Sequence, residues 1–90
     1  MKKVVNVVEV EEAGLITLLG KHVLVFAANY IYTGILSGVN DTCLELSEPK
    51  IVYQTGAYNK DTFEDAQSTG SDVLFVQTNA IESVFETKKR

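Results

Sequence analysis

The 90-residue chain has few of the residues that carry catalysis or bind metals. It contains one cysteine and one histidine, Cys43 and His22, and no sequence motif pairs either of them with a base or a metal ligand. A single cysteine also excludes an internal disulfide. No glycine-rich loop of the phosphate-binding type is present. We therefore expect no catalytic residue, no metal site and no cofactor.

Long apolar runs are missing as well. None approaches the roughly 20 residues needed to cross a membrane, and residues 1–6 lack the apolar core of a signal peptide. With 46% apolar residues, the chain can build one compact core but has no room for a second module. These features predict a single domain over residues 1–90, cytoplasmic and without a membrane partner.

Basic residues are scarce away from the two ends of the chain. Residues 4–87 contain three lysines and twelve acidic residues, a net charge of −9, whereas the whole chain carries −4. The other five basic residues are Lys2, Lys3, Lys88, Lys89 and Arg90. Because broad phosphate binding needs clustered Lys and Arg, any nucleic-acid contact must depend on the ends, on a few local residues or on stacking. The alternative is that the acidity only maintains solubility and the terminal basic residues are solvated.

Segments rich in β-branched and aromatic residues are frequent, and short polar turns separate them. The pattern predicts three strands, over residues 21–28, 30–39 and 42–50. The first reversal falls at Ala28 and Asn29. Gly34 and Gly38 inside the second strand indicate a sharply bent sheet, as a small barrel requires. An extension of the third strand past Pro49 stays open, because proline favours a strand edge or a bulge and argues against a central position.

The remaining segments are predicted from weaker patterns. Residues 4–10 fit a strand and a helix equally well, and the leucine spacing that follows predicts a short helix ending at Gly20. Residues 54–71 are polar, and a capping-box pattern starting at Asp61 would begin one helical turn there. The chain then closes with a predicted hairpin whose turn falls at Thr78 and Asn79.

Two blocks of this sequence resemble the signature of the Sm and Sm-like (LSm) family of ring-forming RNA-binding proteins. The first block, residues 20–46, contains Gly20-Lys21-His22-Val23-Leu24-Val25 and Tyr32-Thr33-Gly34-Ile35-Leu36. A variable loop at 54–71 separates it from the second block, residues 73–84. The resemblance implies an all-β fold with a short N-terminal helix within 4–20, and a strongly bent, five-stranded antiparallel small barrel of the SH3-like type.

The resemblance also implies where nucleic acid would bind. Members of the family contact RNA through an Asp-x-x-x-Asn turn in the first block and an Arg-Gly step in the second. The positions that correspond to these loops carry five candidate residues: Asn40, Asp41, Gln77, Thr78 and Asn79. The family's asparagine is missing, because Leu44 or Glu45 takes its place, and Gln77 replaces the arginine.

The replacement of arginine changes the expected chemistry. Gln77 offers a neutral amide, which can read a base edge but cannot neutralise a phosphate, so we expect weaker and less salt-dependent binding than in a typical family member. The alternative is that the polar residues only form ordinary turns. Tyr58, in the polar loop, is a candidate for stacking on a base.

Assembly is the second property that the resemblance implies. In the family, the fourth strand of one subunit pairs with the fifth strand of its neighbour. The corresponding apolar edges carry no charge and no proline, which would leave them prone to aggregation if unpaired. The candidate interface residues are Val73, Leu74, Phe75, Val76, Ala80 and Ile81. We expect a homo-oligomeric ring of about five to eight copies, unless the N-terminal segment covers the edge.

Together these patterns predict a ring-forming protein that binds single-stranded RNA or another nucleic acid, or that assists RNA processing. A ring that serves as a protein scaffold and has lost RNA binding is the alternative.

Overall fold

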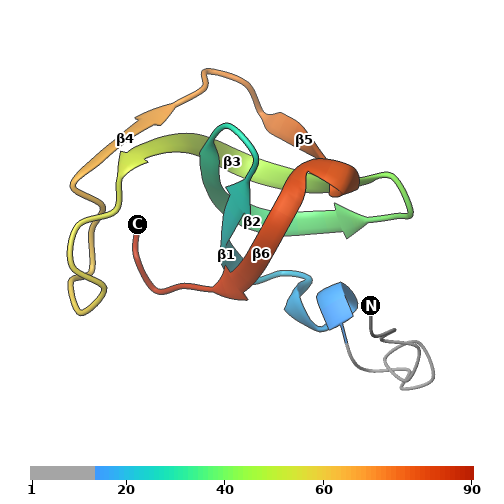
Figure 1. The fold of residues 1–90 in the computed structure, drawn as a ribbon, viewed down its shortest axis with the longest axis horizontal. Helices are drawn as coiled ribbons and strands as arrows, with labels where there is room; N and C mark the ends of the chain where they lie inside the picture. Colours follow the sequence, from blue (N-terminus) through green and yellow to red (C-terminus); the bar gives the residue numbers. More distant parts are fainter. Residues whose placement is uncertain (1–13) are drawn as a thin grey trace.

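A computed structural model describes residues 14–90 and contains six strands and two short 3-10 helices (Figure 1). Most of the predicted lead-in, residues 4–13, lies outside the described residues. The elements are η2 (Gly14–Leu18), β1 (His22–Ala27), β2 (Ile31–Val39), β3 (Cys43–Gln54), β4 (Asp65–Ser68), β5 (Val73–Gln77), η3 (Thr78–Ala80) and β6 (Ile81–Glu86). The prediction of an all-β fold is confirmed, and the strands form before and after the reversal predicted at Ala28 and Asn29.

All six strands belong to one antiparallel sheet. Its order is β4-β3-β2-β1-β6, and β5 pairs with the same edge of β3 as β4 does, one after the other along that strand. Within residues 14–90, β5 and β6 do not pair with each other, so the sheet bends strongly but does not close (Figure 1). The expectation of five strands is therefore corrected to six, in an open sheet.

The long strand β3 is the central element of the sheet. Its first half pairs with β5 and its second half with β4, and the change of partner falls at Glu48 and Pro49. Pro49 is buried at the register irregularity between Thr33 and Ile35 of β2, where a missing N–H removes no regular ladder bond. The extension past Pro49 is thus confirmed as a bulge, and the argument against a central position is wrong.

Gly34 makes this bend possible. A Cβ atom placed on Gly34 would lie 2.8 Å from the backbone oxygen of Ser47, which is closer than a carbon atom can approach. Gly38 is less constrained, because its added Cβ would meet only the flexible Glu45 side chain, at 3.1 Å from Oε1. The bent sheet therefore depends on the first of the two glycines.

The second block does not form the predicted hairpin. β5 pairs with β3, whereas β6 pairs with β1, and η3 carries the chain from one to the other. The tight spacing of two apolar strands looks like a hairpin in sequence. Each strand instead pairs with a separate partner, because β1 and β3 lie on either side of β2 and each offers its other edge (Figure 1).

The helical turn predicted at Asp61 is also wrong. The loop after β3 contains bends, and then strand β4. Backbone carbonyl groups that a helical turn would use internally accept hydrogen bonds from the C-terminal residues instead: Asp61 O from Arg90 N at 2.9 Å, and Thr62 O from Lys89 Nζ at 2.8 Å. Tertiary contacts therefore replace the local helical bonds.

The apolar core lies between β1, β2, the first half of β3, and β5. Its buried members are Val23, Val25, Leu36, Leu44, Leu46 and Val76, and the leucines of η2 pack against them. Gly20 follows η2 with a positive φ of 83°, as expected of a glycine that ends a helix. No helix in residues 14–90 is long and apolar enough to cross a membrane.

Candidate nucleic-acid interface

The two loops predicted to bind nucleic acid meet in the folded chain. Thr78 N donates to Thr42 O at 2.8 Å, and Thr78 Oγ1 donates to Asp41 O at 3.0 Å. The adjacent strands place Gln77 opposite Cys43. Residues from the turn after β2 and from η3 thus form one surface, at the right of Figure 1.

Asn40 has a structural role at this surface. Its Oδ1 accepts hydrogen bonds from Thr42 N at 2.8 Å, Cys43 N at 2.9 Å and Thr42 Oγ1 at 3.0 Å. This is the pattern of an asparagine that holds a turn. A ligand would therefore meet the Nδ2 donor of Asn40 rather than its oxygen. The hydroxyl of Thr78 is also committed, through its bond to Asp41.

The three other candidate side chains are exposed and none is cationic. Asp41, Gln77 and Asn79 all face solvent. Asp41 gives the surface a negative charge, which opposes phosphate, while the amides of Gln77 and Asn79 can donate to and accept from a base edge. The geometry suits hydrogen bonding to bases, but these side chains cannot neutralise the phosphate groups of a nucleic acid.

Tyr58 is not part of this surface. Its side chain is 61% exposed, in the loop that follows the far end of β3. β3 is twelve residues long, and an extended strand of that length spans up to about 36 Å. The loop lies at the left of Figure 1, opposite the β2–β3 turn. A base stacked on Tyr58 would therefore belong to a different contact.

The candidate interface residues divide into two sets. On β5, Leu74 and Val76 face the core, whereas Val73 and Phe75 point outward, and Phe75 is 59% exposed. Ala80 and Ile81 are half-buried, and Ile81 packs against the core. The side chains available to a partner from the predicted set are therefore chiefly Val73 and Phe75.

Phe75 also borders a groove of about 250 Å³ beside the β1–β2 turn. The other residues that line it are Ala27, Ala28, Asn29, Tyr30, Tyr32, Val76, Gln77 and Ala80. The sequence patterns did not predict this groove, because it joins the β1–β2 turn to β5, which are distant in sequence.

The sequence patterns also did not predict a cationic pocket beside the bend of β3. It has a volume of about 230 Å³ and is lined by His22, Thr33, Gly34, Glu48, Lys50, Lys89 and Arg90. The alternative that the terminal basic residues are all solvated is wrong for Lys89, which is only 2% exposed. No local sequence signal marks this burial, since it depends on the chain end folding back onto the loop at residues 60–63.

The pKa of His22 is lowered in this pocket. Partial burial, followed by the positive charge of Arg90, lowers the pKa of His22 below its ordinary value, and Lys50 adds to this effect while Glu48 opposes it. His22 is therefore neutral at pH 7 and can donate from one ring nitrogen and accept at the other.

No group of three or more potential metal-binding side chains occurs within residues 14–90. Searches against protein-family models, curated proteins and solved structures find no match to this chain.

Proposed function

We propose that this chain is an Sm-like subunit that assembles into a homo-oligomeric ring and binds single-stranded RNA through the loops that meet at Thr42 and Thr78. The connectivity supports the proposal: β5 and β6 follow each other in sequence but lie on separate partners, and within residues 14–90 their outer edges carry no strand. In the Sm family, the corresponding edges pair between neighbouring subunits.

The observation that supports assembly is the exposed, apolar and uncharged edge of β5. Phe75 and Val73 expose apolar side chains beside an edge that no strand of residues 14–90 pairs with, and β5 contains no charged residue and no proline. An exposed edge of this kind tends to recruit another strand. Pairing with β6 of a second copy would satisfy both edges and, repeated head to tail, would close a ring.

Sedimentation velocity tests the assembly. We expect the purified protein to sediment as an oligomer at micromolar concentration. Phe75→Lys places a charge on the edge without opening the core, and should shift the protein to monomers. Tyr58→Lys is the matched control, because its side chain is equally exposed but lies on the remote loop. A monomeric parent protein contradicts the assembly proposal.

RNA binding rests on the loop surface. Gln77 and Asn79 are two exposed amides of this surface besides Asn40, whose oxygen holds the turn, and they would face the pore if the family's arrangement holds. Oligouridine and oligoadenine titrations at low and moderate salt test this. The double variant Gln77→Ala with Asn79→Ala should weaken binding about tenfold if each amide contributes a base contact.

The control for this variant is Gln67→Ala with Asn59→Ala, which removes the same two exposed side chains elsewhere. Equal affinity of the two double variants would exclude the pore loops as the RNA contact. Failure of the assembled ring to bind either oligonucleotide at low salt would exclude the RNA proposal as a whole.

A protein scaffold is the second candidate function. Asp41 and the absence of Lys and Arg from both loops favour it, because affinity for single strands normally includes a phosphate term. The exposed Phe75 groove could then hold a protein segment. Assembly without RNA binding would support this function.

A further inference from the structure

The pocket between β1, β2, the bend of β3 and the C-terminal residues combines enclosure with positive charge. Lys50, Lys89 and Arg90 line it, and Glu48 is its one acidic residue, so the side chains sum to about +2 when His22 is neutral. The whole chain carries −4. Three of the eight basic residues of an acidic protein thus converge on one cavity.

We propose that this pocket binds a phosphate monoester group, with Lys50, Lys89 and Arg90 as its ligands. A phosphate monoester carries −1.5 to −2 charges at pH 7 and three acceptor oxygens, so it can accept hydrogen bonds from several cationic side chains at once. The proposal is independent of ring assembly and of RNA binding at the loop surface.

Lys89 is the strongest argument for an anion. Its ammonium is buried and donates to Lys60 O at 3.0 Å and Thr62 O at 2.8 Å, and it lies 5.5 Å from the centre of the Phe63 ring. Carbonyl oxygens and an aromatic face orient the ammonium but carry no full negative charge. An ammonium has three donors, and these two bonds use two of them. Lys89 is at the same time one of the residues that line the pocket.

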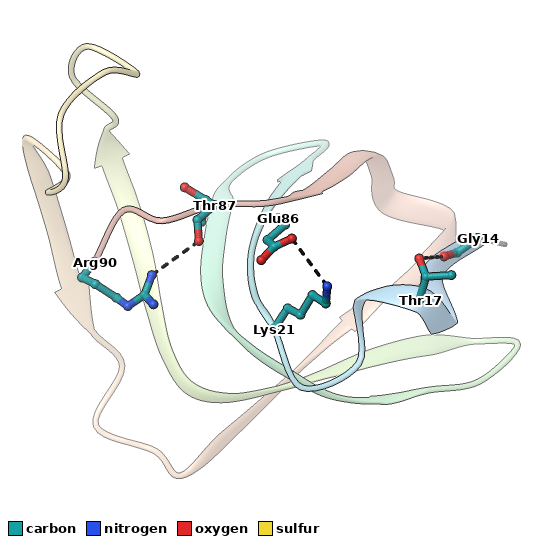
Figure 2. Close-up of polar contacts among 6 residues, drawn as sticks. All are labelled: Gly14, Thr17, Lys21, Glu86, Thr87 and Arg90. Atoms are coloured by element: carbon teal, nitrogen blue, oxygen red, sulfur yellow. Dashed lines mark hydrogen bonds and ion pairs between the residues drawn. The ribbon is translucent and has the colours of Figure 1, made fainter. Parts of the chain in front are cut away.

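The described residues supply no counter-ion for that ammonium. The only ion pair within residues 14–90 joins Lys21 Nζ to Glu86 Oε1, at 3.8 Å, and it is exposed (Figure 2). A buried charge without a counter-ion raises the free energy of the folded chain, and an anion in the adjoining pocket would offset that cost.

Arg90 is positioned to take part. Its Nη1 donates to Thr87 O at 3.4 Å and to Lys89 O at 3.2 Å, which turns the guanidinium back toward β6 (Figure 2). Both bonds use the same nitrogen, so Nη2 and Nε remain as donors. Paired N–H groups of a guanidinium suit two phosphate oxygens at once.

The dimensions limit the ligand. A volume of about 230 Å³ is below the range of about 300 to 1,000 Å³ that is usual for sites of drug-sized ligands. It accommodates a phosphate group and part of a sugar, but not a complete nucleotide. The base or the rest of an oligonucleotide would have to extend outside.

Titration followed by NMR of the backbone amides tests the site, with ribose 5-phosphate as the probe, ribose as the neutral control and sodium chloride at matched ionic strength. We expect the amides of β1, the β3 bend and residues 87–90 to shift with ribose 5-phosphate alone. No shift up to about 20 mM, well beyond a millimolar dissociation constant, would overturn the proposal.

Charge variants sharpen the test in both directions. Lys50→Gln and Arg90→Gln should each weaken binding about tenfold, as expected for loss of a charged hydrogen bond. Glu48→Gln should strengthen it severalfold by removing the opposing charge. Lys21→Gln and Lys88→Gln are exposed controls of the same charge change outside the pocket, and they should bind like the parent chain. Equal affinities for all five variants would refute the assignment.

Three further probes distinguish the sources of the phosphate. Inorganic phosphate, 5′-phosphorylated oligouridine and 5′-hydroxyl oligouridine all contain phosphorus, but only the first two present a dianionic group. Displacement of ribose 5-phosphate by the 5′-phosphorylated oligonucleotide and not by its 5′-hydroxyl form indicates an RNA end, whereas displacement by inorganic phosphate alone indicates a free small anion. Phe75→Lys should bind ribose 5-phosphate normally even if it is monomeric, which separates this site from the proposed ring.

Discussion

The start of β3 and its central bend are built from different chemistry. At the end that begins with Cys43, neutral and acidic side chains form a surface that hydrogen bonds hold together, beginning with Asn40 and Thr78. At the bend that leads into the second half of the strand, Lys50 joins Lys89 and Arg90 around a cavity. Recognition of base edges and neutralisation of phosphate, which nucleic-acid-binding proteins usually combine in one surface, would be separated in this chain.

The difference shows how a family pattern and an electrostatic pattern can point to different places. The resemblance assigns nucleic-acid binding to the loops at residues 40–41 and 77–79, which meet at the start of β3. The basic residues gather at the bend of β3 instead, because the C-terminal segment, whose sequence is typical of a solvated tail, folds back and buries Lys89. The following predictions test whether the start of β3 and its bend are as different in stability and chemistry as the contacts indicate.

The largest expected effect concerns packing. Leu44 is fully buried in the main core near the start of β3, and Leu44→Ala should lower the free energy of unfolding by about 3 kcal/mol. Val52, buried on the second half of β3 but outside that cluster, should cost roughly half as much in Val52→Ala. Urea denaturation at one fixed protein concentration measures both, since assembly would make stability concentration-dependent. Equal costs would show that the core is not concentrated near the start of β3.

The next effect concerns the contact between Lys89 and the loop that contains Lys60 and Thr62. Lys89→Met removes two charge-assisted hydrogen bonds to the loop and should lower the free energy of unfolding by about 2 kcal/mol. It should also accelerate tryptic cleavage after Lys60, whose carbonyl group accepts one of those bonds. Lys88→Met, at an exposed position, is the control. Unchanged stability and unchanged cleavage would mean that the segment does not hold the loop.

A smaller effect is expected at the turn before β3. Asn40→Ala removes the acceptor for two backbone N–H groups and should cost about 1 kcal/mol. Asn40→Asp keeps the acceptor and should stay within about 0.5 kcal/mol of the parent chain. Asn59→Ala, on the remote loop, is the control. If both Asn40 variants match it in urea denaturation, the turn does not depend on this side chain.

The smallest expected effect is a pH dependence of stability that comes from His22 in the cationic pocket. The pKa of His22 is lowered in the folded chain, so between that pKa and the ordinary value the unfolded chain binds more protons, and stability falls as the pH drops through this window. Arg90, Lys50 and Glu48 face His22 across the pocket, and Lys21 and Glu86 flank it.

The His22→Gln variant should lose that part of the pH dependence. Urea midpoints at about pH 7.5 and about pH 5.5, in a buffer without phosphate or sulfate, make the comparison with the parent chain. An identical decrease in both proteins would assign the pH dependence to other groups.

Much of the sheet could be predicted from sequence because its signals are local. The β-branched and aromatic content and the turn residues around Asn29 predict β1 and β2 within about two residues of their observed ends. Gly34 predicts a bend because a glycine inside a strand is costly unless something approaches closely, and the oxygen of Ser47 does so. The candidate loop residues came instead from the resemblance to the Sm family, and no local signal marks them as a binding site.

The errors all involve partners that are distant in sequence. Pro49 argues against a central strand only if the whole strand has one partner on each edge, and β3 changes partner there. The turn at Thr78 looks like a hairpin turn until β5 and β6 are seen on different strands. The loop carbonyl groups near Asp61 were predicted to form a helical turn, but Lys89 and Arg90 bind them.

The sequence alone determined that this chain forms bent antiparallel strands, that its first reversal falls at Asn29, and that the loops after β2 and β5 carry no basic residue. These properties follow from backbone sterics, apolar alternation and composition, which act over a few residues. The tertiary structure decided that the two loops touch at Thr42 and Thr78, that β5 and β6 present separate edges, and that Lys89 lies buried beside a cationic pocket. Those outcomes depend on the bend of one central strand, which brings together groups that are distant along the chain, such as Asp41 with Thr78 and His22 with Arg90.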